Sequence, residues 1–293
     1  MNLALTVLNV TAPVFLLALI GIIWVKLGFE YRVEFVTRLA MTLSVPCLIF
    51  VALMKTEIDP AALADLSLAS LVAYALVILG SLAVVAIARL DRSTYLAPLI
   101  FGNTGNIGLP LALFAFGNEG LSYAVVVFAI MAILSFTFGI WLVAGAGSGG
   151  KVLKEPMVAG TLLGALFLWQ GWQTPELVTN ALELIGQMAI PLMLITLGVA
   201  IARLKVVSMG RAVVLSVLKA ALCVGAAWVV ADWFALSDIA KAVLIVQVAT
   251  PVAVTSYMIA EKYEADSETV AGLVVASTLL SVITLPLILS FVM

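Results

Sequence analysis

Uncharged polar side chains and helix-opposing residues interrupt an otherwise apolar segment that runs from Tyr95 to Phe116. The interruption reads Gly102-Asn103-Thr104-Gly105-Asn106-Ile107-Gly108-Leu109-Pro110. Such a run predicts a helix that breaks partway along its length and frees backbone N–H and C=O groups. At membrane depth these groups are satisfied only where they are buried in protein or line a wet cavity. The break is therefore a candidate binding site.

A second interruption is predicted at Gln247-Val248-Ala249-Thr250-Pro251. Thr250 followed by Pro251 is typical of an N-cap and a first helical residue, and Asn106 or Gly108 could start a matching half-helix ahead of Pro110. Helix N-termini carry partial positive charge and free donors, which suit a carboxylate or another anion. The alternative is a pair of ordinary kinks satisfied by neighbouring helices. The candidate substrate-binding residues are Asn103, Thr104, Asn106, Gly108, Pro110, Gln247, Thr250 and Pro251.

Lys219 lies inside another apolar segment. It follows Arg211 by eight positions, which is about 12 Å along a helix that rises 1.5 Å per residue. An ionisable group at that depth is a functional candidate by default. Two interpretations stay open: a structural cation satisfied by carbonyls of the broken helices, or a charge that titrates or counters the substrate.

The composition places these candidates in a membrane protein. Of the 293 residues, 65% are hydrophobic and 10% are charged, and the mean hydropathy is +1.26. The chain has no histidine, and its two cysteines, Cys47 and Cys223, are isolated in apolar segments. No metal-ligand cluster, histidine triad or Walker-type loop occurs. We therefore expect no enzyme activity, metal or cofactor, and no nucleic-acid partner.

The apolar segments predict an all-α polytopic protein with ten transmembrane helices. A glycine-rich stretch near the midpoint, Ala144 to Gly150, is typical of a linker. We therefore expect one half in residues 1–147, a linker at 148–155 and a second half in residues 156–293. The ten expected spans are 6–26, 36–54, 66–88, 94–116, 121–145, 156–172, 177–201, 208–231, 238–260 and 267–291.

Positive charge falls mainly on one side of these spans. Eleven cations lie on that side, two on the other, and Lys219 inside a span completes the 14. The positive-inside rule makes the richer side cytoplasmic and places both termini outside. The larger group is Lys26, Arg32, Arg38, Arg89, Arg92, Lys151, Lys154, Arg203, Lys205, Arg211 and Lys262; the smaller is Lys55 and Lys241.

Five spans in each half would give the halves opposite orientations, so similarity between them would indicate an inverted repeat. Span one has Pro-x7-Gly-x6-Gly spacing from Pro13, and span six repeats it from Pro156. Proline also interrupts spans two and seven, at Pro46 and Pro191. Pro110 in span four corresponds to Pro251 in span nine, an offset of 141 residues. Paired interrupted helices of this kind indicate a transporter's central site.

The GNTGNIGLPL motif, the ten spans and the length resemble the auxin efflux carrier family, in particular its short bacterial members. The resemblance implies a secondary carrier of organic anions, such as auxin in plants and malonate or malate in bacteria. It also implies a distant fold likeness to bile-acid sodium symporters, with broken helices crossing at the substrate site. Spans 1, 2, 6 and 7 would form a scaffold, and spans 3–5 and 8–10 a core that moves against it. In plant relatives a lysine equivalent to Lys219 faces a carboxylate on span three, but here residues 66–90 contain no Asp or Glu.

These observations predict an elevator-type carrier of a small organic anion in the bacterial inner membrane. Malonate, malate and auxin-like weak acids are the expected substrates, and a homodimer through the scaffold helices is an expected assembly. A passive anion channel and a sodium-coupled symporter are the alternatives. A membrane receptor that binds ligand without flux is a third.

Overall fold

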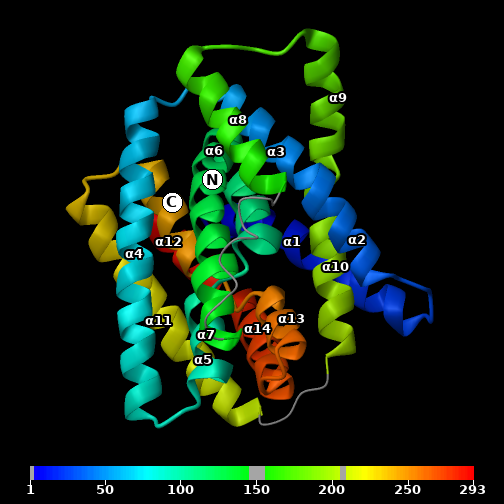
Figure 1. Ribbon diagram of the computed structural model, residues 1–293, viewed down its shortest axis with the longest axis vertical. Coiled ribbons are helices and arrows are strands. Elements are labelled where there is room, and N and C mark those ends of the chain that lie inside the picture. The colour runs from blue at the N-terminus through cyan, green and yellow to red at the C-terminus, as the bar shows by residue number, and fades with distance from the viewer. Residues whose placement is uncertain (1–2, 145–155, 205–208) are drawn as a thin grey trace.

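Helices make up nearly all of the computed structural model, which describes residues 3–144, 156–204 and 209–293 (Figure 1). These ranges contain no β-strand beyond one isolated bridge between Gly102 and Val252. In chain order the helices are α1 Leu3–Lys26, α2 Val33–Leu39, η1 Ala40–Ser44, α3 Val45–Met54, α4 Pro60–Ile87, α5 Arg92–Ile100, η2 Thr104–Gly108, α6 Leu109–Leu134, η3 Ser135–Gly139, α7 Ile140–Ala144, α8 Pro156–Gln170, α9 Glu176–Gln187, α10 Ala189–Arg203, α11 Met209–Trp233, α12 Asp238–Val248, α13 Val254–Lys262 and α14 Ser267–Val292.

Seven helical stretches in the described ranges are long and apolar enough to cross a membrane. The chain is therefore a multi-pass membrane protein. A shorter apolar helix covers Ala159–Gln170, and the expected ninth span is divided between α12 and α13. The longest stretch, Thr104–Val143, has 40 residues and contains one non-helical residue, Gly117 (φ 64°, ψ −154°).

The predicted interruptions of spans two and seven are both present. The π-helix η1 precedes Pro46, which occupies the first turn of α3, and α9 gives way to α10 at Met188, three residues before Pro191. Proline cannot donate to the preceding turn and disfavours helical backbone in the residue before it, so each irregularity lies just ahead of the proline.

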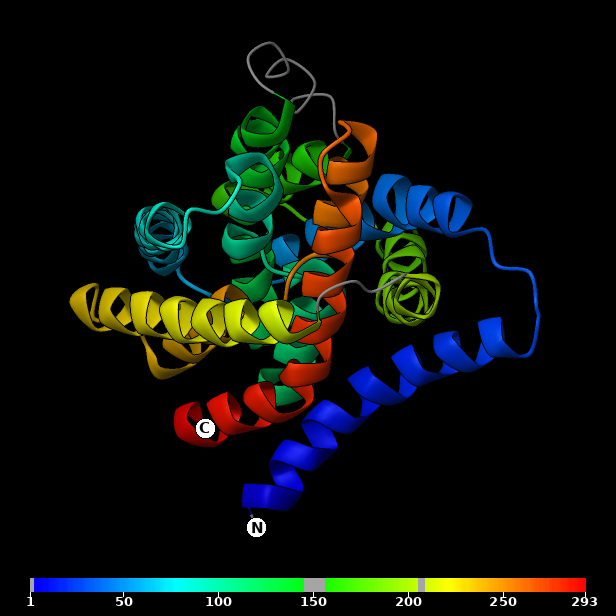
Figure 2. The ribbon, with the colours of Figure 1, turned by 90° about the horizontal axis from the view of Figure 1, so that it is seen from below.

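The helices pack in two groups. In the first, α1 packs along α10, and α3 packs against α8 and α9. In the second, α11 packs against α4, α12 and α14, and α6 packs against α12 and α4. Figure 2 shows α1 (dark blue) at one edge of the molecule and α4 (cyan) on another side. The groups meet where α6 touches α1 and α3, and where η2 touches α10. The broken helices therefore lie where the two groups join.

The predicted linker at 148–155 lies outside the described residues. Three of the cations counted above, Lys151, Lys154 and Lys205, lie outside them as well.

Candidate functional site

The two predicted helix breaks cross and pair with each other. Helix α5 ends at Ile100 and α12 at Val248, and the segments that follow form the antiparallel bridge between Gly102 and Val252. The Asn103 N–H donates to Pro251 O at 2.7 Å, and the Ala253 N–H donates to Phe101 O at 3.3 Å. Each break thus satisfies backbone groups that the other leaves free, which is the requirement for irregular backbone at membrane depth.

The hydrogen bonds at the crossing are related by a local two-fold arrangement. If Gly102 is equivalent to Val252, then Asn103 corresponds to Ala253 and Phe101 to Pro251, and each of the two bonds maps onto the other. The correspondence of Pro110 with Pro251 stays a prediction, because an antiparallel bridge has this local symmetry whichever residues of the two halves correspond. Pro251 lies within its break, whereas Pro110 lies in the first turn of α6, after its half-helix has begun. Proline is tolerated in both settings, so its position alone does not define the register.

The half-helices begin at residues other than those predicted. Thr250 is not an N-cap: its hydroxyl donates to Gln247 O at 2.7 Å and so satisfies the end of α12, while α13 begins at Val254. In the first break η2 begins at Thr104, ahead of both Asn106 and Gly108. The antiparallel pairing explains both shifts, because it holds the backbone extended until each chain has passed the crossing.

Asn103 is the N-cap of the first half-helix. Its Oδ1 accepts from the Asn106 N–H at 3.3 Å, which satisfies one of the donors at the start of η2. This bond also sets the orientation of the amide and leaves Nδ2 as a donor. Asn103 is 6% exposed, and Nδ2 has no hydrogen-bond partner among the described residues. A buried donor without a partner costs about 1–3 kcal/mol, so the position favours a ligand that accepts a hydrogen bond.

Other predicted site residues lie inside the packing of the crossing. Gln247 is fully buried, and its Nε2 donates to Ala124 O at 3.5 Å. A Cβ added to Gly108 would lie 2.1 Å from Gln247 Oε1, and one added to Gly102 would lie 2.2 Å from Thr250 Oγ1. A side chain at Gly102 would therefore collide with Thr250 where the two breaks cross, and one at Gly108 would displace the Gln247 amide.

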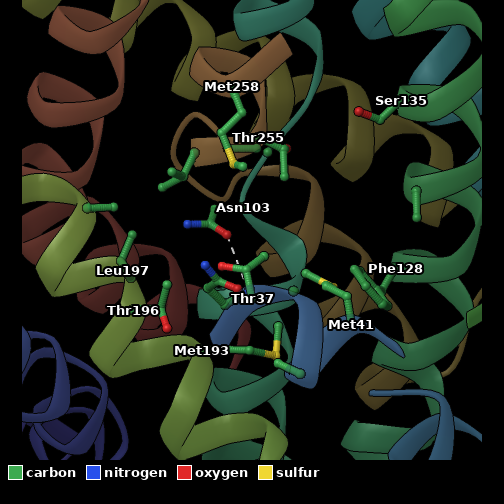
Figure 3. A pocket seen from close by; sticks show the side chains of 18 of the residues that line it. Thr37, Met41, Asn103, Phe128, Ser135, Met193, Thr196, Leu197, Thr255 and Met258 are labelled. Carbon is green, nitrogen blue, oxygen red and sulfur yellow. Dashed lines mark hydrogen bonds between the residues drawn. The ribbon is translucent and has the colours of Figure 1, made fainter. Parts of the chain in front are cut away.

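A pocket of about 70 Å³ adjoins the other side of the crossing (Figure 3). We call it the crossing pocket. Asn103 and Asn106 line it, together with Thr255 from the start of α13. The remaining predicted residues, Thr104, Gly108, Pro110, Gln247, Thr250 and Pro251, are not among the residues that line it. Its full lining is Val33, Thr37, Ala40, Met41, Gly102, Asn103, Gly105, Asn106, Phe128, Met131, Ala132, Ser135, Met193, Thr196, Leu197, Ala200, Ala253, Val254, Thr255 and Met258.

Helix α10 of the first packing group, with α2 and η1 packed against it, supplies eight of the 20 lining residues, none of which the sequence analysis identified. Thr37 and Thr196 face the crossing from α2 and α10, and the Thr196 hydroxyl lies 2.7 Å from the Tyr31 hydroxyl. Burial is the larger influence on Tyr31 and raises its pKa, which the bond to Thr196 partly offsets. Single threonines in apolar helices often bond to their own backbone, so the sequence carries no signal that separates these two from structural ones.

A second, larger cavity of about 1130 Å³ lies between the end of α3, the middle of α6 and the junction of α9 with α10. We call it the vestibule. Five charged residues are among those that line it, namely Lys55, Glu57, Asp59, Glu119 and Glu183. Lys55 forms an ion pair with Glu183, so four carboxylates accompany a single cation. The lining of the vestibule therefore carries net negative charge at neutral pH.

Lys219 lies apart from both cavities, in the packing of α11. It is 3% exposed, and its Nζ donates to Cys223 Sγ at 3.6 Å. Helix α4 packs against α11 and contributes Tyr74 and Ser81, two buried residues whose hydroxyls have no partner in the described part of the chain. The structure thus places the buried amine of α11 beside a helix that carries buried hydroxyls and, between residues 66 and 90, no carboxylate.

Comparisons with known proteins agree with this architecture. The family model described as "Membrane transport protein" matches residues 6–156 and 148–289. A protein named as an uncharacterized transporter from Methanocaldococcus jannaschii is 26% identical over 203 residues, which are 64% of this chain and 64% of that relative. Another uncharacterized transporter, from Methanothermobacter thermautotrophicus, is 26% identical over 291 residues and 94% of each chain. The resemblance inferred from the sequence is confirmed, and the chain belongs to the membrane transport protein family of the auxin efflux carriers.

Proposed function

We propose that this transporter is a secondary carrier of a small organic anion whose carboxylate binds in the crossing pocket. The observation that carries the proposal is that Asn103 lines this pocket and that its buried Nδ2 is a donor without a partner among the described residues. Two half-helices also begin beside it, at Thr104 and Val254, and the first turn of a helix leaves N–H groups without intrahelical partners. Donors and helix dipoles together favour an anion there.

We propose ten crossings in two inverted repeats, with both termini outside. The 40-residue stretch Thr104–Val143 is about 60 Å long at 1.5 Å per residue, twice the hydrocarbon thickness, and the break at Gly117 divides it into two spans. Counting the divided stretch as two makes eight spans of the seven stretches, and the shorter α8 and the broken pair α12 and α13 bring the count to ten.

We further propose that transport occurs by movement of one packing group against the other. The crossing pocket is lined from both groups: Thr37 and Thr196 belong to the first, and Asn103, Asn106 and Thr255 to the second. Sliding the second group along the first would carry the bound anion with the broken helices. Rigid-body movement of one bundle against the other is the expected route to alternating access in inverted-repeat carriers.

Lys219 is the proposed charge that couples or balances transport. It is a buried cation, and the part of α4 between residues 66 and 90 carries no carboxylate to neutralise it. Lys219→Met and Lys219→Arg test this role. We expect the methionine variant to lose uptake, whereas the arginine variant keeps the positive charge and part of the uptake; wild-type uptake by the methionine variant would contradict the proposal.

Exchange in proteoliposomes tests the carrier proposal as a whole. Vesicles preloaded with unlabelled anion should take up labelled anion faster than empty vesicles, because a carrier returns more rapidly when it is loaded. Uptake that rises linearly with concentration and shows no stimulation would instead indicate a channel. Repeating the assay with and without sodium separates the symporter alternative.

A further inference from the structure

We infer that the transported anion is a short monocarboxylate with an apolar body, of about three to five carbons, and not a dicarboxylate. The inference rests on the proposed function and narrows its substrate class. The size, charge and composition of the crossing pocket carry it.

The crossing pocket offers no charged partner. Among its 20 lining residues, all in the described ranges, none is Lys, Arg, Asp or Glu. Most of the wall is apolar and soft, with four methionines, Met41, Met131, Met193 and Met258, together with Phe128. A carboxylate moved into such surroundings without a cation or several donors loses far more hydration than it regains. Methionine side chains, in contrast, adapt to an aliphatic chain.

The positive pole of the pocket suffices for one carboxylate. A helix N-terminus is equivalent to about half an elementary charge, so the two half-helices that begin at Thr104 and Val254 together provide about one. Asn103, Asn106 and Thr255 lie at this pole. Figure 3 shows Ser135 at a distance from Asn103, and Thr196, on another wall, is already engaged with Tyr31. Away from this pole the polar groups of the lining are the hydroxyls of Thr37, Ser135 and Thr196, so a second carboxylate would meet no cation and no amide there.

The volume of the crossing pocket limits the length of the substrate. One water-sized group needs about 10–15 Å³ by this measure, so a pocket of about 70 Å³ accepts about five to seven such groups. Propionate, butyrate and valerate have five, six and seven non-hydrogen atoms. Malonate also has seven non-hydrogen atoms, so the volume of the pocket alone would admit it. Charge must exclude it, because the pocket has no second positive pole for the other carboxylate.

Calorimetric titration of the purified, detergent-solubilised full chain with valerate and malonate tests the inference, because the two acids have equal numbers of non-hydrogen atoms. We expect valerate to bind at least tenfold more tightly than malonate at pH 7. Malonate binding as tightly as valerate or more tightly would overturn the substrate class and leave the anion carrier intact. Binding of neither acid would overturn both proposals.

A positive charge introduced at the edge of the pocket tests whether the absence of a cation causes the preference for a monocarboxylate. Met258 lines the pocket and is 41% exposed, so Met258→Lys can keep its ammonium near water while adding the missing cation. We expect Met258→Lys to shift the ratio of valerate to malonate affinity at least tenfold towards malonate. Met258→Gln, of similar shape and without charge, should leave the ratio unchanged. An unchanged ratio in Met258→Lys would contradict the argument from charge.

Discussion

The two broken helices pair through the same backbone bonds but present different side chains. After the bridge between Gly102 and Val252, the first broken helix continues as Asn103, Thr104, Gly105 and Asn106. The second continues as Ala253, Val254, Thr255 and Ser256. The first thus contributes two amides to the wall of the crossing pocket, whereas the second contributes one hydroxyl, that of Thr255. The second segment contributes to the pocket mainly through its backbone and through the N-terminus of the half-helix that follows it.

The backbone and the side chains of the two broken helices therefore have different roles. The hydrogen bonds of the crossing depend only on two extended segments, which many sequences can form. In the proposed site, recognition of the anion would depend on the amides of Asn103 and Asn106, which both lie on the first broken helix. Changes to the backbone of either helix should therefore affect folding alike, while changes to side chains should affect binding unequally.

The largest expected effects come from filling the close approaches. Gly108→Ala would place a Cβ 2.1 Å from Gln247 Oε1, and Gly102→Ala would place one 2.2 Å from Thr250 Oγ1. Each should lower the free energy of unfolding by about 3 kcal/mol, at the upper end of overpacking costs, measured by thermal unfolding in detergent. Gly210→Ala on α11, where a Cβ meets nothing within 4 Å, is the control. A large loss at only one of the two glycines would show that the side chain met at the other, Gln247 or Thr250, can move aside.

The next largest effect is expected from Asn103→Asp. The aspartate keeps an acceptor for the Asn106 N–H but replaces the free Nδ2 donor with negative charge. Affinity for the transported anion should fall at least tenfold, or about 1.4 kcal/mol, in a binding titration, while the thermal midpoint changes little. Asn180→Asp makes the same change at an exposed position of α9 and should bind as wild type. Unaltered affinity in Asn103→Asp would remove the main support for the site.

Asn106→Ala and Gln247→Ala separate the two sides of the crossing. Asn106 lines the pocket, so its truncation should weaken anion binding by about 1–3 kcal/mol, the value of a hydrogen bond to a charged group. Gln247 packs behind the crossing against Gly108, so its truncation should lower the unfolding free energy and change affinity less. Titration and thermal unfolding of both variants measure the split. Equal losses of affinity would mean that Gln247 reaches the ligand in another conformation.

The smallest expected effect concerns a bond made by the second break alone. The Val252 N–H donates to Ser277 Oγ of α14 at 2.9 Å. Ser277→Ala leaves this buried donor unpaired and should cost about 1 kcal/mol or slightly more of unfolding free energy. Ser290→Ala on the same helix removes a hydroxyl that bonds only to Leu287 O in the structure and serves as the control. Equal stability of the two variants would indicate that water replaces the serine.

The positions of the interruptions could be predicted because they follow from local chemistry. Proline removes a donor and restricts the residue before it, so the irregularities ahead of Pro46, Pro191 and Pro110 and at Pro251 could be located from residue types alone. The start of each half-helix could not. Threonine is a residue type favoured at N-caps, yet the Thr250 hydroxyl donates to Gln247 O at the end of α12. The partner segment at residues 101–103 keeps the residues after Thr250 extended.

The amino-acid sequence by itself determined that this protein is a multi-pass helical membrane protein of a transport family, with helices broken near residues 102 and 251. Hydropathy and helix-opposing residues act locally, so one chain segment suffices to reveal them. Only the tertiary structure decided which side of each break faces a cavity. It separated Asn103 and Asn106 from Gln247 and Thr250, and it brought Thr37 and Thr196 to the same pocket. Those choices depend on helices far apart in the sequence, whose packing no single segment encodes.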